Sequence, residues 1–331
     1  MALSRTTFFF TTRIPTMFRT FLLSCILPLS LLPAAAQSQE VLFYNIAHAI
    51  NHSQYIDWAV SQGANAVEAD LRFTSGGAVD KFQHGMVCEC VASKSDLCTQ
   101  MLSVNTRYQP NPRISKIERV FWPWDACMVN EEADSFMQTL ARKSSIALFI
   151  VDSKVGGSVA KDDRSKASAG RSVIWALEEH LFAKGYGGKV IVGVDEDKHQ
   201  AYTRSAMEVA ARSKYADRIY FSFDENGKSS DKARATVELL KTIAPGKAVY
   251  GNGVSATLIG NFHDAFKVGV AAEKEKTVNL NYIWTLDKAT SMMEYIGIGV
   301  RGIMTNNPGT LRSVLKAFPH MRLARPDDPL L

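Results

Sequence analysis

Short runs of β-branched and aromatic residues alternate with amphipathic segments from residue 41 onward. Such runs are typical of buried strands, whereas apolar positions spaced by three or four residues are typical of helices packed on a sheet. The alternation therefore predicts parallel strands joined by crossover helices. Eight strands are expected, at residues 41–46, 66–73, 146–152, 190–194, 219–223, 248–251, 280–285 and 302–305.

Helical patterns fall between these strands, for example at residues 53–62, 131–143, 168–184, 200–214 and 232–243. Eight strand–helix units close into an α/β fold of the (β/α)₈ TIM-barrel type. Residues 74–130 break the rhythm as a long insertion after the second strand, and loops of that length are usually functional or cross-linked. We expect one domain over residues 37–331.

The N-terminal segment has the form of a secretory signal peptide. Arg5, Arg13 and Arg19 precede an apolar segment at 21–32, which ends in three alanines at 34–36. This pattern predicts cleavage after residue 36 and a secreted protein. An uncleaved membrane anchor is the alternative, although prolines interrupt the segment. Removing residues 1–36 lowers the formal charge from +5 to +2, a balance that does not suggest nucleic-acid binding.

Four cysteines remain in the mature chain, and all of them lie in the insertion. In an oxidising compartment an even set favours two disulfides, and three pairings are open. A zinc site built from His84, Cys88 and Cys90 is the rival interpretation, although its spacing is not the usual two-residue gap. The four are Cys88, Cys90, Cys98 and Cys127.

Three carboxylates come at the ends of predicted strands. Glu68 and Asp70 are two residues apart, so they share one face of the second strand, and Asp152 ends the third. Catalytic groups of a (β/α)₈ barrel lie at the carboxyl ends of its strands. Because Mg²⁺ prefers a few carboxylates completed by water and phosphate, the three predict one Mg²⁺ site. The alternative is that the acids merely meet solvent at strand ends.

Two histidines also come after predicted strands. His48 follows the first strand and His84 lies in the insertion. Two imidazoles beside a metal-bound phosphodiester suggest one base and one acid. Lys154 lies two residues beyond Asp152, so it would either neutralise phosphate oxygens or remain solvated. Trp284 shares a strand face with Tyr282 and suits a cationic headgroup, with a core position as the alternative.

Six segments form a specific pattern when taken in order: residues 48–51 (HAIN), 63–70 (GANAVEAD), 84–90 (HGMVCEC), 151–154 (VDSK), 282–288 (YIWTLDK) and 299–308 (GVRGIMTNNP). With them the chain resembles the secreted sphingomyelinase D, or phospholipase D, toxins of spider venoms and their tick, bacterial and fungal relatives. The resemblance covers most of the mature chain. It implies a (β/α)₈ barrel related to the glycerophosphodiester phosphodiesterases.

The resemblance also implies residue roles. By this resemblance Glu68, Asp70 and Asp152 bind one Mg²⁺ ion, and His48 and His84 carry out acid–base catalysis. Family members cleave sphingomyelin and lysophosphatidylcholine on the headgroup side and release choline. Many use the substrate's own hydroxyl and leave a cyclic phosphate, so lyase and hydrolase labels both stay open. The residues that match headgroup-pocket positions are Lys154, Tyr282, Trp284 and Asn306.

We therefore expect an Mg²⁺-dependent phospholipase D that acts as a monomer, peripherally, on phospholipid at a membrane surface. A glycerophosphodiester phosphodiesterase acting on water-soluble diesters is the alternative enzyme. A lipid-binding barrel with a decayed site is the non-catalytic alternative. Phe121, Trp122 and Trp124 are candidate interfacial anchors, or else a buried cluster under the insertion.

The chain departs from the family pattern in places. The resemblance supports a Cys88–Cys98 disulfide, but the late cysteine of the second venom bridge is absent, so we infer that Cys90 pairs with Cys127. Arg301 and Asn307 stand where venom forms commonly have an acid and an aromatic residue. These differences bear on the choice of headgroup more than on the chemistry.

Overall fold

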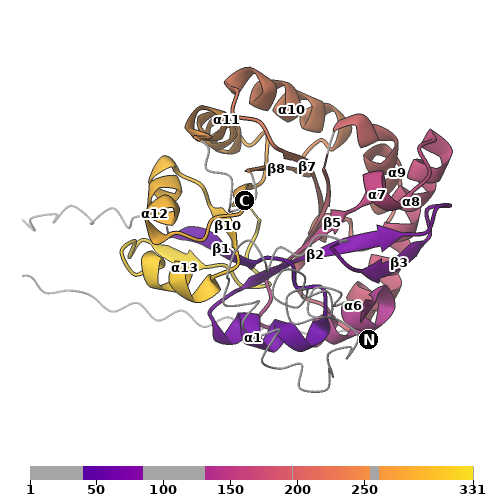
Figure 1. Cartoon of the computed structure of the whole chain (residues 1–331), viewed down its shortest axis with the longest axis horizontal. Helices are drawn as coiled ribbons and strands as arrows, with labels where there is room; N and C mark the ends of the chain where they lie inside the picture. Colours follow the sequence, from indigo (N-terminus) through magenta and orange to yellow (C-terminus); the bar gives the residue numbers. More distant parts are fainter. Residues whose placement is uncertain (1–39, 85–130, 196, 254–260, 331) are drawn as a thin grey trace, which may run out of the picture. The chain divides into compact units, whose positions relative to one another are not determined.

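The structure, a computed structural model, describes residues 40–84, 131–195, 197–253 and 261–330. Eight parallel strands run around a closed barrel in the order β1, β10, β9, β8, β7, β6, β5, β2, and β2 pairs back with β1 (Figure 1). The predicted (β/α)₈ barrel is confirmed. The strands are β1 (Val41–Ala47), β2 (Ala66–Phe73), β5 (Leu148–Ser153), β6 (Lys189–Val194), β7 (Ile219–Glu225), β8 (Ala248–Gly253), β9 (Asn281–Trp284) and β10 (Gly302–Thr305).

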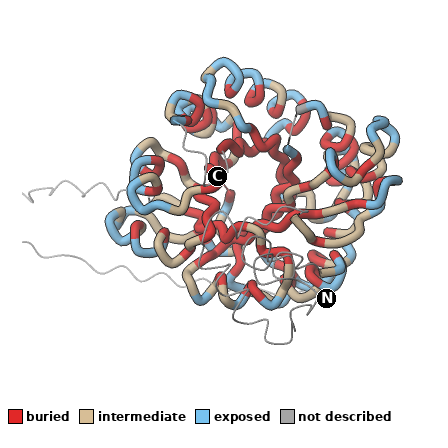
Figure 2. Tube along the Cα trace, in the orientation of Figure 1, coloured by how far each residue is buried: buried red, intermediate tan, exposed pale blue. Residues whose placement is uncertain are grey.

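Helices surround the barrel, and their buried faces turn toward the strands while their exposed faces turn outward (Figure 2). Side chains close several helix ends: Asp162 accepts a hydrogen bond from the Ser165 amide at the start of α8. Within the described ranges no helix has the length and apolar character needed to cross a membrane. The helices are α1 (Ile56–Ser61), α6 (Ala133–Ala141), α7 (Val155–Ser158), α8 (Asp163–Ala176), α9 (Gln200–Ala210), α10 (Ser230–Ile243), α11 (His263–Lys274), α12 (Ala289–Ile298) and α13 (Pro308–Leu315), with short turns η1 (Ser53–Tyr55), η2 (Leu177–Leu181), η3 (Phe182–Lys184), η4 (Asp197–His199) and η5 (Ala216–Arg218).

Alternation along each strand divides the core into two layers. On β2, Val67, Ala69 and Leu71 pack in the layer between strands and helices, so the intervening Glu68 and Asp70 face the barrel interior. Both faces are buried, which explains why the strands are almost continuously apolar. Polar residues at inward positions near the strand ends therefore converge on the mouth of the barrel.

The insertion begins as an antiparallel hairpin, which the alternation alone did not predict. Strand β3 (Val79–Phe82) pairs with β2, and β4 (Glu131–Glu132) pairs with β3. The predicted signal peptide, the four mature cysteines and the three candidate aromatic anchors lie outside the described residues. The two disulfides, the rival zinc site and the anchors therefore stay predictions.

The C-terminal segment closes the barrel at the end opposite the carboxyl ends of the strands. Strand β11 (Met321–Leu323) pairs with the start of β1, and Leu330 packs in the interior cluster of the barrel. Arg301 forms a part-buried ion pair with Glu273 and donates hydrogen bonds to the carbonyls of Asn279 and Leu330. Arg301 thus lies where β10 begins, away from the carboxyl ends of the strands, so the expectation that it bears on the headgroup is wrong.

We predict that Arg301→Ala destabilises the protein, because it leaves the Glu273 carboxylate buried without its cation. The free energy of unfolding should fall by about 3 kcal/mol in urea titrations. The matched control is Lys267→Ala, which breaks an exposed ion pair with Asp264 and should cost less than about 1 kcal/mol. Equal losses in the two variants would contradict a buried structural role for Arg301.

Candidate active site

The register of β2 against β5 brings the three predicted carboxylates together. Asp70 lies opposite Asp152 on the neighbouring strand, and Glu68 lies one inward position before Asp70. One oxygen from each of the three carboxylates lies within 4.8 Å of the others. Glu68 and Asp70 are each about 1% exposed. The charges are therefore concentrated where water solvates them poorly, and such a cluster needs compensation.

Backbone and amide groups from the segment after β1 hold two of these carboxylates. Asn51 donates through Nδ2 to Asp70 Oδ2 at 2.7 Å, and its Oδ1 accepts from the Asp70 amide at 2.8 Å. The amide of Ala49 donates to Glu68 Oε2 at 2.7 Å. Ala49 has a φ of 55°, a strained value for a residue with a Cβ. The strained conformation of Ala49 thus directs its amide N–H toward Glu68.

Lys154 supplies the nearest positive charge. Its Nζ lies 2.9 Å from Asp70 Oδ1 and 2.5 Å from Asp152 Oδ2. Burial alone would lower the pKa of Lys154, but the charges of Asp152 and Asp70 raise it above its ordinary value. For Asp70, burial would raise the pKa, but Lys154, His84 and the hydrogen bond from Asn51 together lower it. Burial, followed by the charge of Asp70, raises the pKa of Glu68 to about 8.

These residues fit a small divalent cation. Oxygens bound to one octahedral Mg²⁺ lie roughly 2.9 Å apart when adjacent and roughly 4.1 Å apart when opposite. The three carboxylate oxygens, which lie within 4.8 Å of one another, would therefore need to approach one another by up to about 2 Å. Among the described residues, Oδ1 of Asp152 is buried and has no hydrogen-bond partner. An acceptor of that kind beside two further carboxylates matches the oxygen ligands of Mg²⁺.

A chain of hydrogen bonds fixes the ring of His48. Its Nδ1 lies 3.0 Å from Asn306 Oδ1, and Asn306 Nδ2 donates to Asp287 Oδ2 at 2.9 Å. Because Asp287 can only accept, the Asn306 amide must present its oxygen to the imidazole. Nδ1 of His48 therefore carries a proton, and in the neutral ring the lone pair belongs to Nε2, which lies 3.9 Å from Glu68 Oε2.

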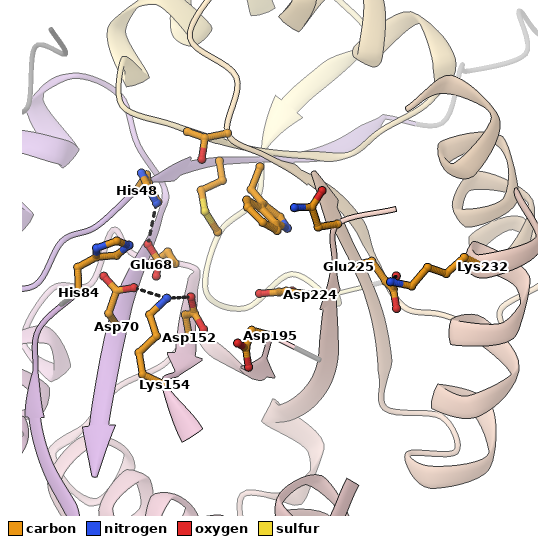
Figure 3. A pocket seen from close by; sticks show the side chains of 14 residues that line it. His48, Glu68, Asp70, His84, Asp152, Lys154, Asp195, Asp224, Glu225 and Lys232 are labelled. Carbon is orange, nitrogen blue, oxygen red and sulfur yellow. Dashed lines mark hydrogen bonds and ion pairs between the residues drawn. The ribbon is translucent and has the colours of Figure 1, made fainter. Parts of the chain in front are cut away.

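A cavity of about 420 Å³ contains the site. One wall of the cavity is formed by six side chains, those of His48, Glu68, Asp70, His84, Asp152 and Lys154 (Figure 3). Among the described lining residues, Asp195, Asp224, Glu225, Asn226 and Lys232 come from β7 and the segments after β6 and β7, and Trp284, Thr285 and Met304 come from the ends of β9 and β10.

The cavity therefore contains both predicted histidines, the three carboxylates, Lys154 and Trp284. The other two predicted headgroup residues are placed behind its lining. Tyr282 is fully buried in the barrel interior, and its hydroxyl donates to Asp224. Asn306 is buried against His48. Tyr282 would influence a bound molecule through Asp224, and Asn306 would do so through His48.

Several residues of the site had not been predicted. Asp224 lines the cavity, and burial followed by the charge of Asp152 raises its pKa to about 7. Its signal was available, because it directly follows the fifth predicted strand, just as Asp152 ends the third. Asn51 and Asp287 lie inside segments that carried the family resemblance, but their roles depend on contacts between strands distant in sequence.

Comparison with known proteins shows that the chain is similar to dermonecrotic toxins. The family described as "Dermonecrotic toxin SPH" matches residues 38–117 and 127–330. The dermonecrotic toxin LlSicTox-betaIA1 of Loxosceles laeta is 23% identical over 299 residues, which cover 86% of this chain and 88% of the toxin. The toxin LsaSicTox-alphaIB1bi of Loxosceles sabina is 24% identical over 294 residues, covering 86% of this chain and 96% of the toxin.

Solved structures share the fold at lower identity. A Silicibacter pomeroyi protein assigned as a glycerophosphoryl diester phosphodiesterase aligns with a TM-score of 0.55 and 12% identity, covering 86% of this chain and 96% of that one. A glycerophosphodiester phosphodiesterase of Parabacteroides distasonis aligns with a TM-score of 0.50 and 14% identity, covering 83% and 98%. Identities this low establish a common barrel and nothing more specific.

The hydrogen bonds around His48 predict its tautomer. In ¹⁵N spectra of histidine-labelled protein at alkaline pH, His48 should show the proton on Nδ1. The variant Asn306→Leu removes the acceptor, so the proton should redistribute toward Nε2. Asn261→Leu, at an exposed site on another loop, is the control and should leave the signal unchanged. A wild-type ring protonated on Nε2 alone would show that Asn306 does not orient it.

Proposed function

The chain belongs to the dermonecrotic toxin SPH family, and on that premise we propose that it is a secreted, Mg²⁺-dependent phospholipase D that removes the headgroup from sphingomyelin and lysophospholipids such as lysophosphatidylcholine. The family is of the phospholipase D type, so the chain is an enzyme that cleaves phosphodiesters. Substrate, ion and mechanism are the parts that we propose.

The observation that carries the proposal is the shared cavity. Two imidazoles, from His48 and His84, face the same 420 Å³ space as three carboxylates suited to a cation. Phosphodiester cleavage needs a proton acceptor for the attacking hydroxyl, a proton donor for the leaving alcohol, and positive charge at the phosphoryl oxygens. The residues on this wall meet each of these needs.

The proposed reaction is an intramolecular transfer. A hydroxyl of the lipid attacks phosphorus, a new P–O bond forms to its oxygen, and the P–O bond to the headgroup breaks. Nε2 of His48 suits the base, because His48 lines the cavity and its Nδ1 is bonded to Asn306. His84 would then give a proton to the departing alkoxide. The product is a cyclic phosphate and a free headgroup alcohol, and attack by water would give the hydrolysed product.

Glu68, Asp70 and Asp152 would hold the ion, and a bound Mg²⁺ would polarise a phosphoryl oxygen. Lys154 occupies the space between two of these ligands. An ammonium and a dication this close would repel each other, so Lys154 would turn toward the phosphate when the ion binds. In that position it would add a donor to the developing charge.

The form of residues 1–36 supports an extracellular location, since it matches a secretory signal. We propose that the mature enzyme meets its lipid substrate peripherally at the membrane surface and acts as a monomer.

Mass spectrometry of lipid products tests the proposal. Sphingomyelin, lysophosphatidylcholine and glycerophosphocholine are incubated with the protein, with and without EDTA. We expect choline release and a cyclic phosphate from the two lipids, abolished by EDTA and restored by Mg²⁺. His48→Ala should lower the rate by roughly 10²- to 10⁴-fold. Turnover of glycerophosphocholine alone would favour the water-soluble alternative, and intact lipid in every condition would remove the proposal.

We further predict that Lys154→Met separates metal binding from turnover. Because the substitution removes an ammonium that competes for Asp70 and Asp152, Mg²⁺ should bind about tenfold more tightly, a gain of about 1.4 kcal/mol. Turnover of sphingomyelin should nevertheless fall. Isothermal titration with Mg²⁺ and the lipid assay give the two readouts, and exposed Lys161→Met serves as the control. Weaker Mg²⁺ binding in the variant would mean that Lys154 positions the carboxylates.

A further inference from the structure

The segment between β1 and η1, residues 48–52, supplies hydrogen bonds that hold two of the metal-site carboxylates. The amide of Ala49 donates to Glu68 Oε2 at 2.7 Å, and the side-chain amide of Asn51 donates to Asp70 Oδ2 at 2.7 Å. Ala49 has a φ of 55°, and a strained conformation of this kind persists only where the surrounding structure imposes it. What fixes this β1–η1 segment therefore decides how well the carboxylates are held.

The barrel fixes the start of the β1–η1 segment, and one carboxylate fixes the residue that follows it. The backbone amide of His48 donates to the carbonyl of Thr305 on β10 at 3.1 Å. At the other end Ser53 begins η1, and both of its donors bond to Glu131. The Ser53 amide donates to Oε2 at 2.6 Å, and Ser53 Oγ donates to Oε1 at 3.1 Å. Two donors on the two oxygens of one carboxylate fix the orientation of Ser53 as well as its distance.

Strand pairing brings Glu131 to this position. Glu131 begins β4 and lies opposite Phe82 on β3, and Phe82 in turn lies opposite Leu71 on β2. Leu71 directly follows Asp70, so the pairing of β2, β3 and β4 sets Glu131 at the level of the metal-site carboxylates. Glu131 is nevertheless absent from the described lining of the cavity. It can therefore influence the site only through the residues that it holds.

The Glu131 carboxylate depends on hydroxyl and amide donors. Its side chain is 12% exposed, and within the described ranges no lysine or arginine forms an ion pair with it. His52 Nδ1 lies 3.5 Å from Oε2, but this nitrogen accepts a hydrogen bond from the amide of Gln54. Besides Ser53, the donor is Ser135 Oγ on α6, 2.8 Å from Oε1. Because hydrogen bonds to an ionised acceptor are stronger than neutral ones, Glu131 holds Ser53 firmly.

We propose that Glu131 is a positioning residue for the metal site, because its hold on Ser53 keeps Ala49 and Asn51 directed at the carboxylates. The inference rests on the proposed function, since it names a residue on which ion binding and turnover at that same site depend. The competing anchor is core packing, because Ile50 and Tyr55 are buried on either side of Asn51. Packing places apolar side chains, whereas the bonds to Glu131 fix the backbone that carries the polar donors.

Glu131→Gln tests this, because the amide keeps the size of the side chain but offers one acceptor oxygen in place of two. In protein kept metal-free with EDTA, NMR should show the amide hydrogens of Ala49 and Asn51 exchanging with solvent about tenfold faster or more. The amide of Ala324, bonded to the Phe43 carbonyl at the other end of the barrel, should exchange at its wild-type rate. A general loss of stability would accelerate exchange at all three positions.

Titration calorimetry with Mg²⁺ and turnover of sphingomyelin give two further readouts. Glu131→Gln should bind Mg²⁺ about tenfold more weakly, and its loss of kcat at limiting Mg²⁺ should largely recover at saturating Mg²⁺. Ser53→Ala removes only one of the two bonds, so it should change the same quantities less. Its effect in the Glu131→Gln background should be smaller than its effect alone, because the two residues share one interaction.

The matched control is Asp57→Asn, the same acid-to-amide change in an exposed ion pair with Lys143 that also joins α1 to the segment after α6. It should leave every readout within about twofold of wild type. Unchanged amide exchange in Glu131→Gln, or faster exchange with unchanged Mg²⁺ affinity, overturns the inference alone. Intact lipid with wild type, together with the expected exchange and Mg²⁺ effects, overturns the proposed function alone. A wild type that binds no Mg²⁺ overturns both.

Discussion

The site depends on holding three carboxylates close together where water is scarce. Glu68 and Asp70 are almost completely buried, and Asp152 lies at the same register as Asp70 on the adjoining strand. Bare charges at such distances repel one another, and burial increases the penalty. Lys154, Asn51 and the strained peptide at Ala49 all contribute donors to this cluster. These donors compensate the clustered charge in the folded chain, and among the described residues they leave Oδ1 of Asp152 without a hydrogen-bond partner.

The same strand geometry supplies both the core and the chemistry. On β2 and β7 the outward residues are apolar and pack under the helices, while the inward residues change from apolar to polar toward the carboxyl end. Because parallel strands share register, polar ends from neighbouring strands meet without any loop having to fold over them. This explains why the site is formed mostly by residues at or near strand ends.

Local patterns were sufficient to predict the strands, since each observed barrel strand lies within two residues of its predicted ends. They also located Glu68, Asp70 and Asp152, because period-two spacing and strand ends are local properties. Local patterns could not predict contacts between strands that are distant in sequence. The support of Asn306 for His48, the burial of Tyr282 behind Asp224, and the position of Arg301 at the far end depend on which strands adjoin and which end each residue faces.

The two walls of the cavity are built from separate strands, which has a consequence for specificity. The metal-site carboxylates come from β2 and β5, whereas Asp224 comes from β7 and is held by Tyr282 on β9. Gly193 and Gly251 leave the space that this pair requires, so a side chain added there would disturb the second wall first. Under the proposed function, substitutions at buried positions of β6 to β9 would change which headgroup is accepted, while the residues that β1, β2 and β5 position would retain the proposed chemistry.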